Sequence, residues 1–322
     1  METFRLENES VLIEFLDLGG CITQMVNKKT DTNYVLSYQD QRLYQSNPYY
    51  FGATIGRNAG RTYPTYYMNA INMKIPLDSN EREVHLHGGQ NGLHRKLWKA
   101  KRVSDLCYRL SFKDTDSLYE PMEFWMDYRL KDNTFKIDMW GRADQPTICN
   151  LTNHSYFNLN KNKKQTIENH NLTVSPAKIQ IIDDRFVPTG EYISGANSFG
   201  KYFDFTEEKK IKSALNNGTK LSEICADGID LAYCFSNSDF SNPKIDLTSD
   251  DGKNHLTVTT NQEACVIYTL NKIGQLIEVG QGVPVKKYQG ITFEMQRKPN
   301  YVHEAEDYLT KEYHSISSYQ IY

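Results

Sequence analysis

Short apolar stretches separated by turn residues recur along most of this 322-residue chain. Many alternate apolar and polar side chains, the period that turns one face of a strand toward a core. Many short strands with turns between them predict antiparallel sheets packed on each other. The strand-like stretches are 11–16, 100–112, 124–130, 135–140, 179–182, 231–235, 256–260, 264–270 and 290–294.

Turn signals support this interpretation, and helix signals are few. Lys131-Asp132-Asn133 separates two strand-like stretches and predicts a hairpin, and Asp251-Gly252 tolerates the positive φ of a type I′ turn. Helices are expected only at 207–215 and 307–314, and both are short. With no linker, repeat or composition break, the sequence predicts an all-β fold: one large antiparallel β-sandwich with few short helices, a single domain over 1–322.

Charge and cysteine content narrow the possible partners. A net charge of −3 argues against a nucleic-acid or anionic-membrane partner, which normally requires a basic patch. The short basic run of Lys161, Lys163 and Lys164 is expected in a solvated loop. No apolar run approaches the ~20 residues of a membrane helix. The six cysteines form no C-x-x-C pair and are expected to be buried free thiols, and the N-terminus lacks an apolar signal region. We therefore expect a cytoplasmic protein.

The densest polar stretch runs from Leu151 to Leu159, with the sequence L-T-N-H-S-Y-F-N-L. It holds one histidine among two asparagines, two hydroxyls and two aromatic rings. A mixed surface of this kind suits a sugar, which offers hydroxyl edges and apolar C–H faces together. The alternative is a structural loop whose histidine is satisfied by hydrogen bonds.

Two glycine-rich stretches also carry polar side chains. Residues 52–62 contain Arg57 and Arg61, but the G-K-[ST] ending of a phosphate loop is missing, so a structural turn is the alternative. In residues 85–94, His85 and His87 would share a face on a strand. One interpretation is therefore a metal site with His94 as third ligand. No acidic residue nearby completes such a site. An active-site histidine or a solvated turn therefore competes with it.

Two carboxylates stand at the start of, or inside, apolar runs. Asp230 precedes a strand-like stretch, where a turn or cap is the ordinary role, and Glu294 lies inside another. Strand parity decides whether Glu294 faces solvent or a cavity. Neither G-x-S-x-G nor G-x-G-x-x-G occurs, so a serine nucleophile and a dinucleotide lack support. The chemistry left is a histidine and a carboxylate acting as acid and base, with no cofactor.

Taken together and in order, these stretches resemble the aldose 1-epimerases, also called galactose mutarotases. The resemblance spans most of the chain. Its segments are G-R-N-A-G-R (56–61), L-H-G-G (86–89), N-L-T-N-H-S-Y-F-N-L (150–159), V-P-T-G-E (187–191), G-I-D (228–230) and F-E-M-Q (293–296).

The resemblance implies the fold and the roles of several residues. It implies a galactose mutarotase-like supersandwich that interconverts the α and β anomers of a free hexose without cofactor or metal. Glu294 would be the general base and His154 the general acid, and His87, Arg57 and Asp230 would bind and orient the sugar. The expected partner is a small-molecule hexose, bound by a monomer or a homodimer.

Ring opening of a pyranose removes the proton of the anomeric hydroxyl and adds a proton to the ring oxygen. A base and an acid on opposite sides of the ring perform both steps. The pKa values of these side chains in short peptides are ~4.3 for Glu and ~6.5 for His. We therefore expect the site to hold Glu294 ionised and His154 protonated in the resting complex.

Departures from the family pattern leave the preferred sugar open. Residues 116–122 read D-S-L-Y-E-P-M in place of a glycine-rich turn, and 92–94 read G-L-H in place of G-F-D. Three alternatives also stay open. They are an epimerase of hexose 6-phosphates, which would need an extra basic cluster, a non-catalytic sugar-binding protein, and a metal-dependent enzyme using His85, His87 and His94.

Overall fold

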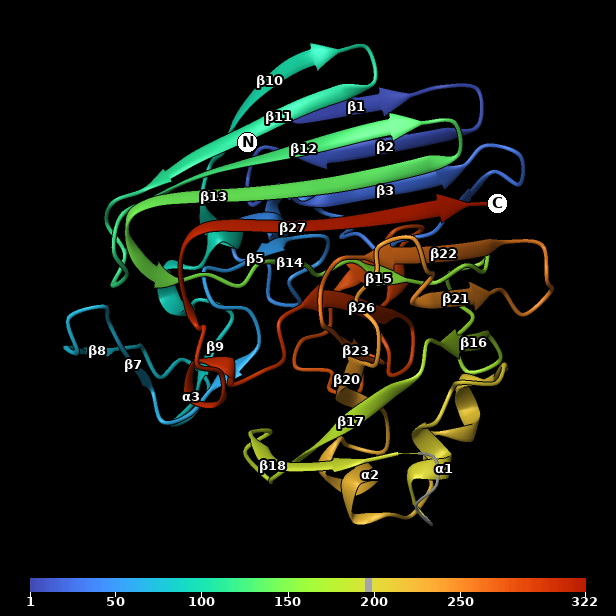
Figure 1. Ribbon diagram of the computed structural model, residues 1–322. Coiled ribbons are helices and arrows are strands. Elements are labelled where there is room, and N and C mark those ends of the chain that lie inside the picture. The colour runs from blue at the N-terminus through green and yellow to red at the C-terminus, as the bar shows by residue number, and fades with distance from the viewer. Residues whose placement is uncertain (195–198) are drawn as a thin grey trace.

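The computed structural model describes residues 1–194 and 199–322. Its largest element is a nine-stranded antiparallel sheet (Figure 1). In spatial order the strands are β10 (Lys99–Ser104), β11 (Cys107–Asp114), β12 (Met122–Lys131), β13 (Thr134–Ile148), β27 (Leu309–Ile321), β22 (His255–Thr260), β21 (Ile245–Thr248), β16 (Asn171–Val174) and β19 (Lys209–Lys210).

A six-stranded antiparallel sheet carries the residues of interest. Its order is β15 (Tyr156–Phe157), β26 (Ile291–Gln296), β23 (Ala264–Tyr268), β20 (Asp230–Phe235), β17 (Ala177–Ile182) and β18 (Pro188–Ile193). A four-stranded sheet at the N-terminus follows chain order, with β1 (Thr3–Glu7), β2 (Val11–Leu16), β3 (Ile22–Asn27) and β4 (Thr32–Asn33).

Four two-stranded pairings and a few short helices complete the described elements. The pairs are β5 (Thr54–Ile55) with β14 (Thr152–Asn153), β6 (Arg61–Thr62) with β9 (His85–Leu86), β7 (Tyr66–Met68) with β8 (Lys74–Pro76), and β24 (Glu278–Val279) with β25 (Val283–Pro284). The helices are α1 (Gly200–Phe203), α2 (Lys220–Ile224) and α3 (Tyr301–Glu304), with 3₁₀ turns at Gln41–Gln45, Gly89–Asn91, Leu93–Arg95 and Ile211–Ser213. None of the helices in the described part of the chain is long and apolar enough to cross a membrane.

The β12–β13 hairpin shows how the sequence dictates the sheets. Phe124, Met126 and Tyr128 alternate with more exposed neighbours along β12, so one face of the strand is buried. Asp132 turns the chain at φ 52°, as the Lys131-Asp132-Asn133 signal predicted. The predicted all-β fold built from antiparallel sheets is confirmed.

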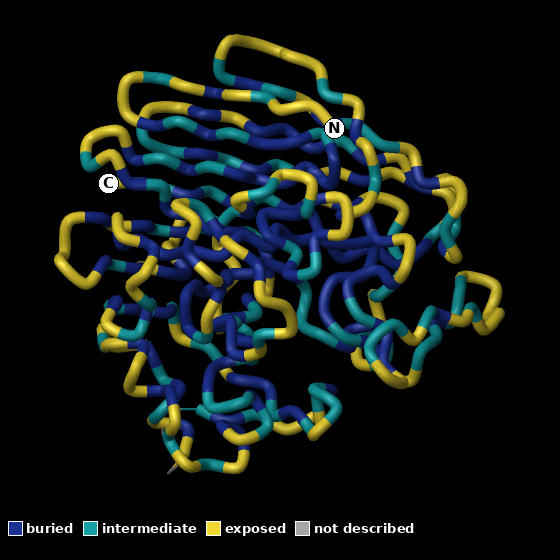
Figure 2. The backbone as a smooth tube through the Cα atoms, turned by 180° about the vertical axis from the view of Figure 1, so that it is seen from behind, coloured by how far each residue is buried: buried dark blue, intermediate teal, exposed yellow. Residues whose placement is uncertain are grey.

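One cluster of buried apolar side chains joins the three sheets. Phe157 of β15 stacks on Phe293 of β26 at 5.7 Å and on Tyr319 of β27 at 5.8 Å between ring centroids, so it links the six-stranded to the nine-stranded sheet. Figure 2 shows buried backbone running through the middle of the molecule and exposed segments gathered in loops. Since Phe293 faces this core, its neighbour Glu294 points to the opposite face of the strand.

Both helix expectations are wrong. Residues 207–215 contain the short strand β19 and a 3₁₀ turn, and 307–314 run into β27, the strand at the centre of the nine-stranded sheet. Along β27, Tyr313, Tyr319 and Ile321 are buried on one face, with less buried residues between them. Pairing of Leu309–His314 with β13 overrides the weak helix propensity of this segment, and β22 pairs only with the later residues of β27, 317–321.

The expected solvated basic run is also wrong at one position. Lys163 is 5% exposed, and its ammonium donates to the backbone carbonyls of Asn33, Asn158 and Asn160. Three acceptors satisfy the three donors of the buried charge, and burial lowers the pKa of Lys163 to about 7. This lysine therefore fastens the loop that follows the L-T-N-H-S-Y-F-N-L stretch.

Candidate active site

A cavity of about 280 Å³ lies on the face of the six-stranded sheet that is turned away from the core. Strand pairing places Glu294 beside Val266, and Val266 beside Ala232. Continuing the register of β17 with β20 places Gln180 beside Ala232, and continuing that of β15 with β26 places His154 beside Glu294. The five side chains form one row along the cavity floor, with His154 and Glu294 at one end and Gln180 at the other.

A second row on the same face lies two residues along each strand. Asp230 pairs with Tyr268, Tyr268 with Thr292, and Thr292 with Tyr156. Of these, Asp230, Tyr268 and Tyr156 line the cavity. The floor therefore combines aromatic rings near the histidine–glutamate end with a carboxylate two strands away, a mixture suited to a ligand with both polar and apolar faces.

The two glycine-rich stretches build the opposite wall by packing backbone against backbone. Strand β6 pairs with β9, which puts Arg61 beside Leu86 and next to His87. Gly88, at φ +83°, passes so close to Gly56 that an added Cβ would lie 2.0 Å from the Gly56 carbonyl oxygen. Any larger residue at position 88 would push the two stretches apart, so the glycine is required for His87 to reach the cavity.

His154 is held by its backbone and by its neighbour. Its N–H donates to the Ala53 carbonyl at 2.9 Å, and its carbonyl accepts from the Gly52 N–H at 3.1 Å. The side-chain amide of Asn153 also donates to the Gly52 carbonyl, and its oxygen accepts from Ser155. The Asn-His-Ser sequence thus supplies a rigid support from which the imidazole projects into the cavity.

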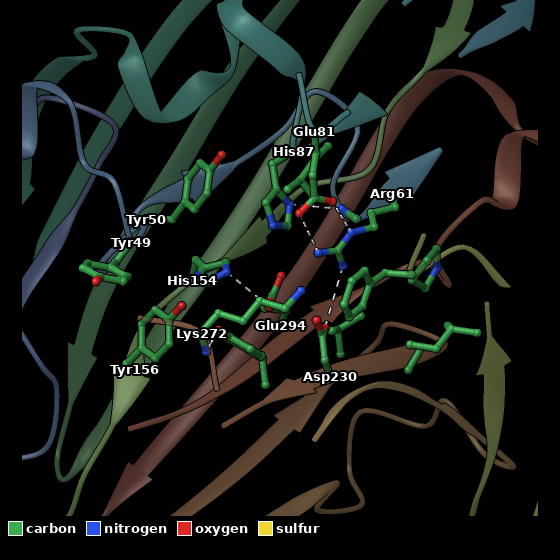
Figure 3. Close-up of a pocket in the computed structure, with 18 of the residues that line it drawn as sticks. Tyr49, Tyr50, Arg61, Glu81, His87, His154, Tyr156, Asp230, Lys272 and Glu294 are labelled. Atoms are coloured by element: carbon green, nitrogen blue, oxygen red, sulfur yellow. Dashed lines mark hydrogen bonds and ion pairs between the residues drawn. The ribbon is translucent and has the colours of Figure 1, made fainter. Parts of the chain in front are cut away.

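His154 and Glu294 form the reactive pair of the cavity. His154 Nε2 lies 3.4 Å from Glu294 Oε1, and both side chains are almost fully buried (Figure 3). Burial raises the pKa of Glu294 to about 8, with a further contribution from the Asp230 charge, and burial lowers the pKa of His154 to about 3. The free site therefore differs from the ionised Glu294 and protonated His154 that are expected in the complex. At neutral pH the shared proton resides mainly on the carboxyl group.

His87 contributes a hydrogen-bond donor. The Gly60 N–H donates to His87 Nδ1 at 3.2 Å. Burial holds the pKa of His87 well below its usual value, so the ring is neutral. A neutral imidazole whose Nδ1 accepts carries its proton on Nε2. The His87 ring packs against His154 at 5.4 Å between centroids, so this N–H is presented beside the reactive pair.

Arg61 stands between two carboxylates at the side of the cavity. Its Nε lies 2.5 Å from Glu81 Oε2, and its Nη1 lies 3.8 Å from Asp230 Oδ1, as Figure 3 shows. Burial alone would lower the pKa of Arg61, but Asp230 and Glu81 outweigh burial and raise the pKa. Lys272 lines the same region, and burial lowers its pKa while Asp230 opposes the shift. The charges near Asp230 are thus closely balanced.

His87, His154 and Glu294 also offer ligand atoms that all lie within 4.8 Å of one another, the donor set of a transition-metal site. The tautomer of His87 opposes this use. Its Nδ1 accepts the Gly60 N–H, so the ring proton is on Nε2. A metal bound at Nε2 would force this proton onto Nδ1, where it would face the Gly60 N–H.

The alternative metal set of His85, His87 and His94 is not brought together. His85 Nδ1 contacts the Asp78 carbonyl at 2.8 Å and its Nε2 contacts the Tyr119 hydroxyl at 3.1 Å, so His85 points away from the cavity. The reason is that His87 adopts φ 55°, which ends the strand and breaks the expected alternation.

Comparison with known proteins identifies the family of this chain. The family model described as aldose 1-epimerase matches residues 2–322. The chain belongs to the aldose 1-epimerase family. It is 26% identical over 310 residues to the galactose mutarotase of Sus scrofa, covering 94% of this chain and 87% of that protein. It is 28% identical over 309 residues to the aldose 1-epimerase of Haemophilus influenzae, covering 92% and 86%. The chain is thus an enzyme of the isomerase class.

Solved structures extend the likeness to the fold. A GalM/aldose epimerase homologue from C. elegans superposes with a TM-score of 0.89 at 19% identity, covering 100% of this chain and 98% of that one. Galactose 1-epimerase from Lactobacillus acidophilus superposes with a TM-score of 0.85 at 24% identity, covering 99% and 93%. The fold is therefore that of the galactose mutarotases.

Within this family member, four of the five expected site residues lie together and one does not. Glu294, His154, His87 and Asp230 line the cavity, and Arg57 does not. The Arg57 guanidinium donates to Asp114, to the Glu120 carbonyl at 2.6 Å and to the Thr147 hydroxyl at 2.7 Å, and it is 1% exposed. The structure therefore corrects the expectation. Arg57 ties the loop to the nine-stranded sheet, and Arg61 is the arginine of the cavity.

The sequence interpretation also missed Glu81, Lys272 and Gln180 as cavity residues. Glu81 and Lys272 lie outside every segment of the family resemblance, so their sequence context gave no signal. Gln180 lies in a predicted strand, where a lone amide among isoleucines was a signal, because a polar side chain on a buried strand face requires a partner.

Proposed function

We propose that this protein interconverts the α and β anomers of a free hexose by opening and reclosing the pyranose ring. The observation that carries the proposal is the 3.4 Å contact of His154 Nε2 with Glu294 Oε1 at one end of a buried cavity. The cavity volume of about 280 Å³ is near the lower end for small-molecule sites and is suited to a single sugar ring.

In the proposed reaction, Glu294 takes the proton of the anomeric hydroxyl while His154 gives a proton to the ring oxygen. The C1–ring-oxygen bond breaks, and C1 becomes an aldehyde. Rotation about C1–C2 then presents the other face of the aldehyde, and the reverse transfers close the ring. The Nε2–H of His87 supports the oxygen atoms at this end, and Asp230 accepts from sugar hydroxyls.

The burial of the pair favours ring opening. The reaction begins from ionised Glu294 and protonated His154, a state that requires the proton to move from Oε1 to Nε2 when sugar hydroxyls enter. The two proton transfers then leave a neutral carboxyl and a neutral imidazole beside the open aldehyde. Burial favours this neutral state, as the raised pKa of Glu294 and the lowered pKa of His154 show. The cavity thereby lowers the free energy of the open-chain intermediate.

The charges around the cavity favour a free sugar over a hexose 6-phosphate. Arg61 and Lys272 are the cationic side chains among the described lining residues, and Glu81, Asp230 and Glu294 are the acidic ones. Glu81 already binds the Arg61 guanidinium, so the cavity has no surplus positive charge to bind a phosphate group, which carries a charge of about −1.5 to −2 at pH 7. We further propose a cytoplasmic enzyme, with a small-molecule hexose rather than nucleic acid or membrane as its partner. Buried free thiols support that location.

Polarimetry on freshly dissolved α-glucose and α-galactose tests the proposal, with wild type and Glu294→Gln side by side. We expect faster decay of rotation with wild type only. Acceleration of hexose 6-phosphates alone would replace the free sugar by its phosphate. Sugar binding without any acceleration would establish a non-catalytic sugar-binding protein, and activity lost in chelator would establish the metal alternative.

A further inference from the structure

Gln180 has an unusual environment for a buried amide. It is 1% exposed, and neither its oxygen nor its nitrogen has a hydrogen-bond partner among the described residues. Buried polar groups are nearly always paired, because an unpaired one forfeits its bonds to water and gains nothing in return. An amide left in this state requires a partner that enters the cavity from outside.

Only a few side chains combine this state with a place in the cavity wall. Of the described residues with a buried, unpartnered side-chain nitrogen or oxygen, three line the cavity: His154, Glu294 and Gln180. Two of these form the proposed acid–base pair. The third is therefore singled out by the same property that marks the reactive groups.

The sheet fixes where Gln180 stands relative to the reactive end. It lies in the same cross-strand row as Glu294, with Ala232 and Val266 between them. Three strand spacings separate the two backbones, roughly 14 Å at ~4.8 Å each. The side chains of Ala232 and Val266 are short, so the floor between the two ends is open to a flat ring.

A pyranose whose C1 lies at Glu294 has C4 at the opposite side of its ring, flanked by C3. A carboxamide offers both an acceptor and donors, which matches a hydroxyl that gives and receives a hydrogen bond. Resting on the proposed function, we propose that Gln180 hydrogen-bonds a hydroxyl on the C3–C4 edge of the sugar. Gln180 thereby sets the preference between hexoses that differ in configuration at C4.

The test compares wild type with Gln180→Met, which keeps the length of the side chain and removes its hydrogen-bonding groups. Rates are measured by polarimetry on glucose, galactose, 3-deoxyglucose and 4-deoxyglucose. We expect the substitution to lower kcat/KM about 3- to 10-fold on a sugar that carries the bonded hydroxyl, the effect of one neutral hydrogen bond. On the deoxy sugar that lacks this hydroxyl, wild type and variant should be equal, and the glucose-to-galactose ratio should change.

Gln289 provides a matched control. It is also a fully buried glutamine, but its amide donates to the Lys163 carbonyl at 2.8 Å and its oxygen accepts from the Lys286 N–H at 3.1 Å. It does not line the cavity. Gln289→Met should lower stability and leave the ratios among the four sugars unchanged. An equal loss on all four sugars with Gln180→Met, or no loss on any, would overturn the proposal.

Calorimetric binding of the same sugars separates this inference from the proposed reaction. If wild type binds without turnover, and Gln180→Met weakens only the sugars with the bonded hydroxyl, the role of Gln180 stands and the catalytic proposal falls. If wild type turns the sugars over and Gln180→Met changes nothing, the reverse holds. If wild type neither binds nor turns over any of them, both are overturned. Should Gln180→Met not fold, equal wild-type rates on all four sugars would overturn the inference by themselves.

Discussion

Two histidine–carboxylate pairs in this molecule, each with a buried histidine, differ in how completely they are bonded. His170 Nδ1 lies 2.6 Å from Asp250 Oδ1, and its Nε2 accepts the Leu159 N–H at 2.9 Å. His154 and Glu294 are 3.4 Å apart, and His154 Nδ1 and Glu294 Oε2 have no hydrogen-bond partner among the described residues. Both ring nitrogens of His170 are thus hydrogen-bonded within the protein, whereas the second pair has polar atoms that can bond a ligand.

The pKa shifts of the two carboxyl groups follow the same contrast. Burial would raise the pKa of Asp250, but the hydrogen bond and charge of His170, together with smaller contributions from Asn160 and Lys210, outweigh burial and lower the pKa. For Glu294, burial dominates and the pKa is raised to about 8. A fully hydrogen-bonded pair therefore stabilises the fold, and a pair with unbonded polar atoms holds a proton that it can transfer to a substrate.

The largest expected effect separates the two pairs by activity. Glu294→Gln and His154→Ala should each lower kcat at least about 10²- to 10⁴-fold, the contribution of one positioned proton transfer, while the fold is retained. His170→Ala should keep kcat per folded molecule and lower the free energy of unfolding, because the Leu159 N–H loses its acceptor. Polarimetry and urea titration measure the two quantities. A His170→Ala enzyme that folds stably but is inactive would break the comparison.

The two arginines of the first glycine-rich stretch allow the same comparison with a smaller effect. Arg57→Met leaves the buried Asp114 carboxylate unpaired and should cost about 3–5 kcal/mol of stability. Arg61→Met should instead raise KM and lower kcat/KM roughly 10- to 100-fold, the value of a charged hydrogen bond. Denaturant unfolding and rate measurements on both variants check this. Loss of sugar affinity in a stable Arg57→Met protein would show that Arg57 takes part in sugar binding.

The pH dependence of the rate is a third test of the unsatisfied pair. The pair holds one proton between the pKa of His154, about 3, and that of Glu294, about 8. We expect kcat/KM to be level through neutral pH and to fall tenfold per unit above about pH 8. Groups with ordinary pKa values would put the alkaline limb near ~6.5, the value for histidine. A limb there would mean that burial does not govern the pair.

The strands were predictable from sequence because alternation and turn residues act locally. The β12–β13 hairpin with its turn at Asp132 and the strand Val11–Leu16 lie where expected. Strand β27 was not predictable in its first residues, because Leu309–His314 carries too few apolar residues to show a period. The segment is extended because β13 pairs with it along one edge, a long-range constraint.

The candidate site was predictable where a residue's role follows from its local motif, as for His154 in Asn-His-Ser. It was not predictable where the outcome depends on the path of an irregular loop. Arg57 and Arg61 lie four residues apart in one glycine-rich stretch, and the pairing of β6 with β9 decides which of them enters the cavity. The protonation of Glu294 in the free site was not predictable, because desolvation depends on the closed cavity, which residue order does not show.

The last expected effect concerns the pH dependence of stability, to which the two carboxylates contribute with opposite signs. The pKa of Glu294 is higher in the folded than in the unfolded chain, so the folded state binds more protons between about pH 4.5 and 8. Wild-type stability should therefore fall across this window relative to Glu294→Gln, by roughly 1 kcal/mol for each pH unit, and the difference should level off above pH 8.

Asp250, whose pKa is lowered, has the opposite effect. It contributes stability above the unfolded pKa, and this stability is lost as pH falls through its folded pKa, so Asp250→Asn should differ most from wild type at neutral pH. Urea titrations of both variants at several pH values measure these slopes. If the stability difference between wild type and Glu294→Gln has the same pH dependence as that between wild type and Asp250→Asn, the two pairs have the same environment. The contrast between a structural and a reactive pair would then fail.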